Sequence, residues 1–302
     1  MAESSNGKRQ VTSLQPHLAK GFIFAAIGLL LFACMDSATK YLTEHYNVPF
    51  VVAIRYLVHF ALMVLILAPR YSAPLLQTQR RGLVIVRSMM LVVMSLSVGL
   101  ALHRMPQAET TAITFLAPML VVLLAAPLLG ERIGALGWLA AVAGFGGILL
   151  IARPGRGLEA VGVGFALLAA GANTAYQLVS RILAATERPI TLLFYAALAG
   201  SVVFGLALPW TWDNQTPTQL ELVLFFCMGA AGGLGHYFFT LAYRYAPASF
   251  LAPVIYLQLM WAGILGWLVF GNRPDYLSVL GMLIVAGSGL MVALKLRIGR
   301  NK

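Results

Sequence analysis

A few ionisable side chains lie inside long apolar stretches of this chain, and these residues could do chemistry. Asp36 is the most distinctive, because a helix that begins near residue 20 and rises 1.5 Å per residue places it roughly 24 Å along its axis. Lys40 follows one turn later on the same helical face. An acid in an apolar stretch predicts a site that binds a proton or a substrate ammonium group. The alternative is an internal ion pair in which Lys40 neutralises Asp36.

Three further ionisable residues belong to this candidate site. Arg55 and His59 are one turn apart in the second apolar stretch, and His236 is deep in the eighth. The alternatives for Arg55 are a guanidinium that extends to the membrane interface and an ion pair with Asp36 or Glu44. A buried neutral histidine with a hydrogen bond is the ordinary explanation of His59 and His236, and a proton relay or a substrate contact is the other.

Four other residues have structural explanations. Glu109 opens the fourth apolar stretch, where a helix N-terminus stabilises a carboxylate. Arg87 lies near the start of the third stretch, and we expect it to extend to the interface. Cys34 and Cys227 lie inside apolar stretches, so we expect small buried hydrophobic residues rather than a disulfide or metal ligands.

A second candidate group is polar or aromatic without charge. Such side chains line apolar pockets and orient planar or amphipathic ligands. The alternative for the aromatic members is a belt at the membrane interface. The group consists of Asn173, Tyr176, Gln177, Tyr237, Tyr256, Gln258 and Trp261.

The composition of the whole chain indicates a polytopic membrane protein. Of 302 residues, 60% are apolar and 10% are charged, and the mean hydropathy is +0.84. A soluble domain carries about 25% charged residues, so this chain has too little polar surface to fold in water. The net charge of +11 reflects where Lys and Arg lie relative to the bilayer, and we expect no nucleic-acid partner.

A membrane span needs roughly 20 apolar residues, and ten stretches qualify. Their spacing predicts an all-α fold of ten transmembrane helices with short loops. It gives tails at 1–19 and 297–302 and two five-span units at 20–152 and 161–296. The expected spans are 20–41, 49–68, 82–102, 108–129, 134–152, 161–182, 190–209, 219–242, 247–270 and 275–296.

Basic residues then predict the orientation. Cytoplasmic loops are enriched in Lys and Arg, and fourteen of these residues fall on one side of the ten spans against four on the other. Both termini are therefore expected in the cytoplasm. The four on the opposite side are Arg104, Arg153, Arg156 and Arg273.

The two units repeat each other at a distance of 141 residues. An odd number of spans in each unit means that the second copy inserts upside down relative to the first. Inverted repeats around a midplane cavity are typical of secondary transporters. The shift superimposes Ala101, Pro106, Met119, Gly130 and Arg132 on Ala242, Pro247, Met260, Gly271 and Arg273, and Gly21, Phe24, Ala25 and Lys40 on Gly162, Phe165, Ala166 and Arg181.

The repeated segments resemble the EamA branch of the drug/metabolite transporter superfamily over about residues 20–296. The first is Ala101–Pro106 through Ala117-Pro118 to Gly130-Glu131-Arg132, and the second is Ala242–Pro247 to Gly271-Asn272-Arg273. The family pattern has a proline within span four and an acid after the terminal glycine. The second copy departs from it, with Leu259 and Asn272 in these places.

This resemblance implies inverted repeats around a central cavity walled mainly by spans 1, 3, 4, 6, 8 and 9, with alternating access. Members of the family move amino acids, aromatic compounds, vitamins, nucleotide-related metabolites and sugars. The stretch Phe32–Lys40 resembles a subgroup with an Asp at this place, which includes riboflavin-like and S-adenosylmethionine-like carriers.

The expected function is secondary active transport of a small organic metabolite, such as an amino acid or an aromatic or heteroaromatic compound, out of a bacterial cell across the inner membrane. The chain carries no zinc helix, phosphate loop or nucleophile elbow, so we expect neither an enzyme nor a cofactor or metal site. The sequence leaves open whether protons drive transport or whether the protein is an uncoupled facilitator or exchanger. It also leaves open a homodimer.

Overall fold

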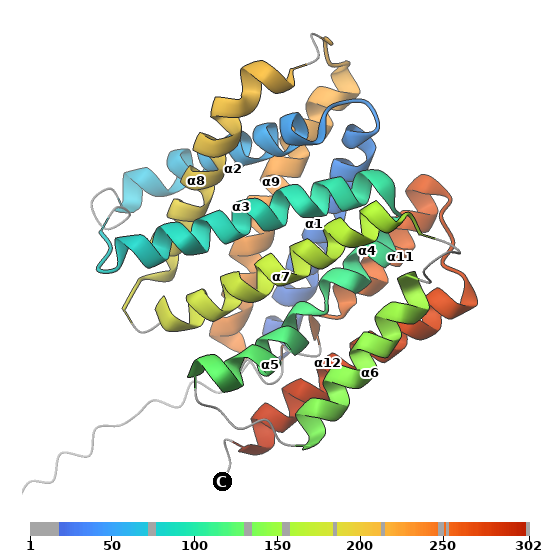
Figure 1. Cartoon of the computed structure of the whole chain (residues 1–302). Coiled ribbons are helices and arrows are strands. Elements are labelled where there is room, and N and C mark those ends of the chain that lie inside the picture. Colours follow the sequence, from blue (N-terminus) through green and yellow to red (C-terminus); the bar gives the residue numbers. More distant parts are fainter. Residues whose placement is uncertain are drawn as a thin grey trace, which may run out of the picture.

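The regular structure of the described residues is entirely α-helical. The computed structural model describes residues 18–71, 77–129, 135–152, 158–183, 186–212, 215–246, 251 and 254–299. The helices, in chain order (Figure 1), are α1 (Leu18–Thr43), α2 (Val48–Tyr71), α3 (Arg81–Arg104), α4 (Gln107–Thr114), α5 (Ala117–Leu129), α6 (Ala135–Ala152), α7 (Ala160–Leu183), α8 (Pro189–Thr211), α9 (Gln219–Tyr245), α11 (Leu257–Phe270) and α12 (Tyr276–Gly299).

These helices confirm the predicted fold class, with one difference. The predicted spans 108–129 and 247–270 are not continuous helices: the first is divided between α4 and α5, and the second is interrupted before α11. Pro118 explains the first break, because proline has no N–H to donate and disfavours helix in the residue before it. Among the described residues, five helical segments are both long and apolar enough to cross a membrane: Ala19–Thr43, Val48–Ile66, Arg81–Arg104, Pro189–Thr211 and Gln219–Phe239.

Local sequence signals set several helix ends. Pro189 opens α8, where its missing N–H costs nothing. Thr218 and Glu221 form a capping box at the start of α9: each side chain accepts a hydrogen bond from the backbone N–H of the other. α11 ends at Gly271, whose φ of 68° is a left-handed conformation that glycine adopts without a steric cost.

Helix packing follows a two-fold pattern that matches the 141-residue repeat. α1 packs along α9, and their repeat equivalents α7 and α3 pack along each other in the same way. α2 packs on its own equivalent α8, and α6 packs on its equivalent α12 at the lower right edge of the molecule (Figure 1). The chain therefore consists of two intertwined five-span units.

One pair of close contacts shows the repeat at atomic detail. A Cβ added to Gly21 on α1 would collide with Ala246 just after α9. A Cβ added to Gly162 on α7 would collide with Met105 just after α3. The 141-residue shift relates Gly21 to Gly162 and Met105 to Ala246. The two contacts are therefore equivalent helix crossings in the two repeats.

Hydrogen bonds and an ion pair connect the segments that meet at each end of the molecule. At the α2–α3 end, the Glu187 carboxylate accepts from the backbone N–H groups of Gln79 and Arg80, both at 2.9 Å. At the α1–α2 end, the Tyr46 hydroxyl donates to Glu221 at 3.0 Å. An ion pair joins Arg104, the last residue of α3, to Glu159 just before α7. These pairings agree with the alternation of ten spans.

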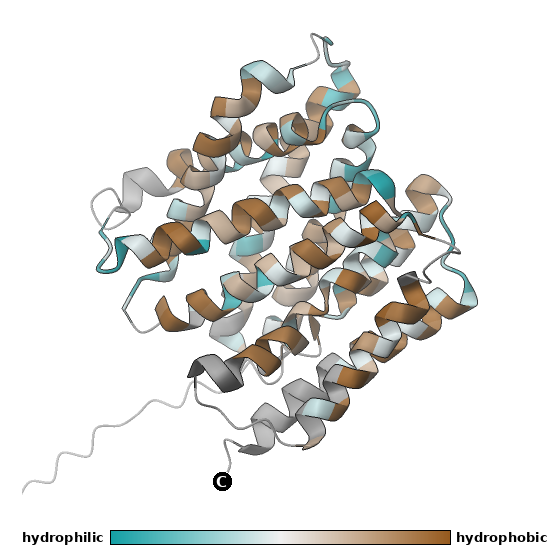
Figure 2. Cartoon of the chain, in the orientation of Figure 1, coloured by the Kyte–Doolittle hydropathy of each residue, from teal (hydrophilic) through white to brown (hydrophobic). Residues whose placement is uncertain are grey.

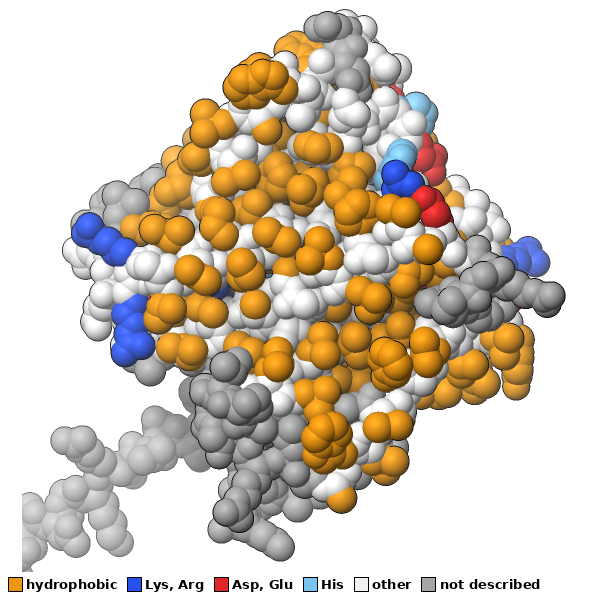
Figure 3. Space-filling model, viewed as in Figure 1, with side chains coloured by type: hydrophobic (Ala, Val, Ile, Leu, Met, Phe, Trp, Pro, Cys, Tyr) orange, Lys and Arg blue, Asp and Glu red, His pale blue; other side chains and the backbone are white. Residues whose placement is uncertain are grey.

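The outer surface of the helices is apolar between these two ends. Hydrophobic residues run along the helices in Figure 2, and charged side chains gather at the ends of the face shown in Figure 3. Cys34 and Cys227 belong to this surface: both are exposed, so the prediction that they are buried in the protein is wrong.

Two adjacent glycines on α6 give a matched test of this packing. A Cβ at Gly147 would lie 2.9 Å from the carbonyl oxygen of Gly281 on α12, whereas a Cβ at Gly146 would meet nothing within 4 Å. Gly147→Ala should therefore separate α6 from α12 and destabilise the protein by about 1–3 kcal/mol. Gly146→Ala should raise stability by about 0.5–1 kcal/mol, because alanine favours helix. Thermal unfolding in detergent would measure both, and equal melting temperatures would contradict the packing.

Candidate functional site

A cavity of about 240 Å³ lies between the two repeats. Its lining residues come from α1, α2, α3 and α4 of the first repeat and from α7, α8, α9 and α11 of the second. Polar side chains concentrate here within an otherwise apolar molecule. The lining consists of Phe32, Met35, Asp36, Arg55, Tyr56, His59, Leu91, Met94, Ser95, Val98, Leu102, Thr110, Thr111, Thr114, Phe115, Asn173, Tyr176, Leu193, Ala196, Ala197, Gly232, His236 and Gln258.

The structure brings seven of the predicted site residues together around this cavity. They come from five helices that are far apart in the sequence. They are Asp36, Arg55, His59, Asn173, Tyr176, His236 and Gln258.

Five predicted site residues do not line the cavity. Tyr237 is 59% exposed on the outer surface of α9. Gln177 donates a hydrogen bond to Asn173 at 3.2 Å, one turn away from the lining. Trp261 packs against the apolar cluster around Leu29 and Ala242. The other two are Lys40 and Tyr256, whose contacts are described below.

The two charged residues of the lining are almost fully buried. Asp36 and Arg55 are each 7% exposed. Gln258 donates to the Asp36 carboxylate at 3.5 Å, a long hydrogen bond. The Arg55 guanidinium lies 5.3 Å from the centre of the Tyr56 ring, close enough for a cation–π contact.

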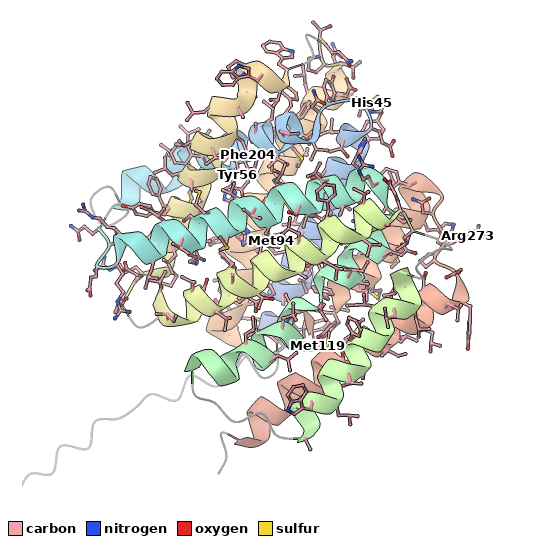
Figure 4. The ribbon with its side chains drawn as sticks, in the orientation of Figure 1. His45, Tyr56, Met94, Met119, Phe204 and Arg273 are labelled. Carbon is pink, nitrogen blue, oxygen red and sulfur yellow. The ribbon has the colours of Figure 1, made fainter. Side chains whose placement is uncertain are left out.

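Tyr56 is itself fixed from both sides. Its hydroxyl and that of Ser95 on α3 share a hydrogen bond of 2.7 Å. Its ring stacks on Phe204 of α8 with centroids 5.6 Å apart, and the two labelled rings lie together in Figure 4. Arg55 thus lies on a rigid aromatic surface at the cavity wall.

The two histidines of the lining form an aromatic pair. The rings of His59 and His236 stack with centroids 6.2 Å apart and 19° between their planes. Phe32 meets His236 edge to face at 4.8 Å. Gly233 on α9 leaves room for His59, since an added Cβ would lie 3.2 Å from its ring. Both rings are therefore held in place beside Asp36 and Arg55.

Arg87 is buried, and the prediction that it extends to the interface is wrong. It is 5% exposed, and its guanidinium donates to Ser180 at 2.7 Å, to the Leu192 carbonyl at 3.0 Å and to the Tyr176 hydroxyl at 2.6 Å. It joins α3, α7 and α8 between the cavity and the α2–α3 end. Since Tyr176 lines the cavity, Arg87 is a site-supporting residue that sequence reasoning missed.

Lys40 is also buried, and it lies near the α1–α2 end of the molecule. Its ammonium donates to the carbonyls of Leu102 at 2.9 Å and Met105 at 3.0 Å, where α3 ends. A cation at a helix C-terminus is favourable, and the charges of Glu44 and of Glu109, in the first turn of α4, also act on Lys40. The structure does not contain the Asp36–Lys40 ion pair that was one alternative.

The breaks in spans four and nine meet beside the cavity. Phe115 follows α4, Tyr256 precedes α11, and their rings make an edge-to-face contact at 5.5 Å. The 141-residue shift relates these two residues to each other, so the contact lies on the two-fold axis of the repeats. Thr110, Thr111 and Thr114 line the cavity just before the first break.

A second hollow lies apart from these polar groups. It is a groove of about 590 Å³ between α11 and α12, with almost entirely apolar walls and Arg273 at one end. Arg273 stacks on Trp267 at 5.0 Å and is labelled at the edge of the molecule in Figure 4. Although it is larger, this groove opens on the apolar outer surface, and the described residues of its walls hold no cluster of polar or ionisable side chains. The central cavity is therefore the candidate site.

Comparisons with known proteins agree with this architecture. A sequence model of the EamA-like transporter family matches residues 19–153 and again residues 160–294, two segments that begin 141 residues apart. A solved crystal structure aligns with a TM-score of 0.66 over 92% of this chain and 98% of that chain, at 18% identity, and so has the same fold.

Three curated relatives illustrate the range of similar proteins. A riboflavin transporter of Rhizobium johnstonii is 32% identical over 63% of this chain and 63% of its own length. An S-adenosylmethionine uptake transporter of Rickettsia prowazekii is 25% identical over 90% of this chain and 92% of its own length. A pseudopaline exporter of Pseudomonas aeruginosa is 26% identical over 89% of this chain and 94% of its own length.

Proposed function

Because the chain belongs to the EamA-like transporter family, we propose that it moves a small organic metabolite across the bacterial inner membrane by alternating access. The observation that supports this most strongly is the cavity between the repeats, which holds a carboxylate, a guanidinium and two histidines inside an apolar molecule. Ionisable groups in a membrane interior are costly, and they mark substrate and ion pathways. We take residues 20–152 and 161–296 as the two repeats and place both termini in the cytoplasm.

Two of the buried cations, Lys40 and Arg87, suggest how access alternates. Lys40 ties α1 to the end of α3 on one side of the cavity, and Arg87 ties α3 to α7 and α8 on the other. We propose that these contacts close opposite ends and open in turn. The breaks at Phe115 and Tyr256 provide flexible points in two equivalent spans, as in other transporters with interrupted helices. No chemical conversion of the solute is part of this proposal.

We propose that transport of the solute is coupled to protons and that the solute is exported. Asp36 is the acid of the cavity. The other titratable or charged residues of the lining are Arg55, Tyr56, His59, Tyr176 and His236. The alternative is an uncoupled facilitator or exchanger of a vitamin-like or nucleoside-like metabolite. The names of the riboflavin and S-adenosylmethionine relatives favour that alternative.

Asp36→Asn should abolish the effect of a pH gradient on transport while leaving the fold intact. An amide has nearly the same shape as a carboxyl group but cannot take up or release a proton. The measurement is the flux of radiolabelled S-adenosylmethionine, riboflavin and the standard amino acids in proteoliposomes, with and without the gradient.

The matched control is Glu159→Gln, which alters an exposed carboxyl group just before α7. It should respond to the gradient as the wild type does. If Asp36→Asn still responds, Asp36 has no part in coupling. If the wild type itself transports without any response, the uncoupled alternative is correct.

A further inference from the structure

The charged groups in the interior of the molecule have very different surroundings. Lys40 and Arg87 donate to carbonyl and hydroxyl oxygens at 2.6 to 3.0 Å, so their charges are solvated by the protein. Asp36 and Arg55, by contrast, face the cavity. Within the described residues, neither of the two has a group of opposite charge within 4.0 Å.

This arrangement is costly for the protein alone. A charge removed from water requires a partner of opposite charge or several hydrogen bonds. Asp36 and Arg55 are each 93% removed from solvent, since their exposed fractions are 7%. The charges of Asp36 and Arg55 act on each other, but no ion pair joins them, so this anion and this cation on the wall of one cavity are complementary to a solute that carries both charges.

We propose that the cavity binds a zwitterion, with its carboxylate on Arg55 and its ammonium group on Asp36. This proposal rests on the transport function and specifies the class of solute. A guanidinium presents parallel N–H groups that fit a carboxylate in a bidentate way. A carboxylate accepts the hydrogen bonds of an ammonium group.

The rest of the lining fits the body of an amino-acid-like solute. Drug-sized ligands occupy pockets of about 300–1,000 Å³, so the cavity of about 240 Å³ favours a smaller molecule. Three threonines of α4 line one part of it. Rings and thioethers line another part, namely Phe32, Met35, Met94 and Phe115. An apolar or aromatic side chain would contact these.

The assignment also gives proton coupling a physical basis. One carboxylate cannot hold a proton and an ammonium group at the same time. Binding of the solute would displace a proton from Asp36, and its release would allow a proton to return, so the two would cross the membrane in opposite directions.

The test uses the purified full chain and three panels of compounds. These are the standard α-amino acids, their amides, which lack the carboxylate, and their N-acetyl derivatives, which lack the ammonium group. A ligand that binds the folded state raises the melting temperature by mass action. We expect at least one amino acid to raise it and to bind about 10- to 100-fold more tightly than either derivative, the range that a lost charged hydrogen bond gives.

Two variants separate recognition from a structural role. In Arg55→Gln, the best amino acid and its amide should bind with similar affinity, while the N-acetyl compound stays weak. In Asp36→Asn, the amino acid and its N-acetyl derivative should become similar, while the amide stays weak. Arg188→Gln and Glu159→Gln change exposed residues at the two ends and should preserve the wild-type preferences.

Several results would overturn the zwitterion proposal. One is stabilisation by the amides or N-acetyl compounds that equals that of the amino acids, and another is no response to any amino acid. A third is a variant pattern in which all compounds weaken alike. A protein that ignores amino acids but carries riboflavin in proteoliposomes would refute this proposal and leave the transport function intact.

Discussion

Replacing Arg87 by methionine is expected to reduce transport at least about tenfold and to lower the free energy of unfolding by about 1–3 kcal/mol. The guanidinium holds Tyr176, Ser180 and the Leu192 carbonyl, and it lies 4.3 Å from the centre of the Tyr176 ring. Methionine has a similar length but no donors. The Tyr176 ring would lose the contact that fixes it at the cavity wall.

Flux in proteoliposomes and thermal unfolding measure the two effects. Arg81→Met is the matched control, because Arg81 is exposed at the start of the same helix, and it should behave as the wild type. Arg87→Lys should recover only part of the activity, since an ammonium group cannot make the planar three-way contact. If Arg87→Met matches Arg81→Met in both measurements, Arg87 does not support the site.

Thr114→Trp is expected to reduce transport to background without unfolding the protein. Thr114 ends α4 and lines the cavity, so an indole ring there would occupy the space that a solute needs. The cavity measures only about 240 Å³, which leaves no room for both. Solute binding and flux should be lost together.

The control for this variant places the same side chain on the outer surface. Leu206 is 68% exposed on α8, so Leu206→Trp would face lipid and should leave transport unchanged. Thermal unfolding would show whether each variant folds. Normal flux through a folded Thr114→Trp protein would mean that solute does not pass through this cavity.

Much of the fold was predictable because membrane spans are local features of a sequence. Long apolar stretches and the 141-residue repeat predicted the fold class, and the paired packing of α1 with α9 and α3 with α7 confirms it. The interruption of span four also has a local signal in Pro118. The interruption at Tyr256 lacks the equivalent proline, since Leu259 takes the place of Pro118, and the repeat relation to Phe115 is what reveals it.

The sequence alone identified the ionisable residues of the cavity. Asp36, Arg55, His59 and His236 stand out because ionisable groups are rare in apolar stretches, and all four line the cavity. Arg87 was misjudged because its burial depends on α7 and α8, which are distant in the sequence and lie opposite its side chain.

Tyr237 was misjudged for a related reason. It follows His236 directly in α9, and consecutive residues on a helix point about 100° apart, so one side chain faces the cavity and the other faces outward. The rotation of α9 about its axis follows from its packing on α1. That contact joins residues some two hundred positions apart, which no local pattern indicates.

The most direct test of the account is the labelling of one cysteine in the cavity from each face of the membrane. Ser95→Cys changes one atom of a lining residue, and Cys34→Ser with Cys227→Ser removes the two exposed native thiols. In oriented vesicles, a membrane-impermeant maleimide should react with this cysteine from either side, because alternating access exposes the cavity to each in turn. Reaction from one face alone under all conditions, or from neither, would contradict a solute cavity shared by two inverted repeats.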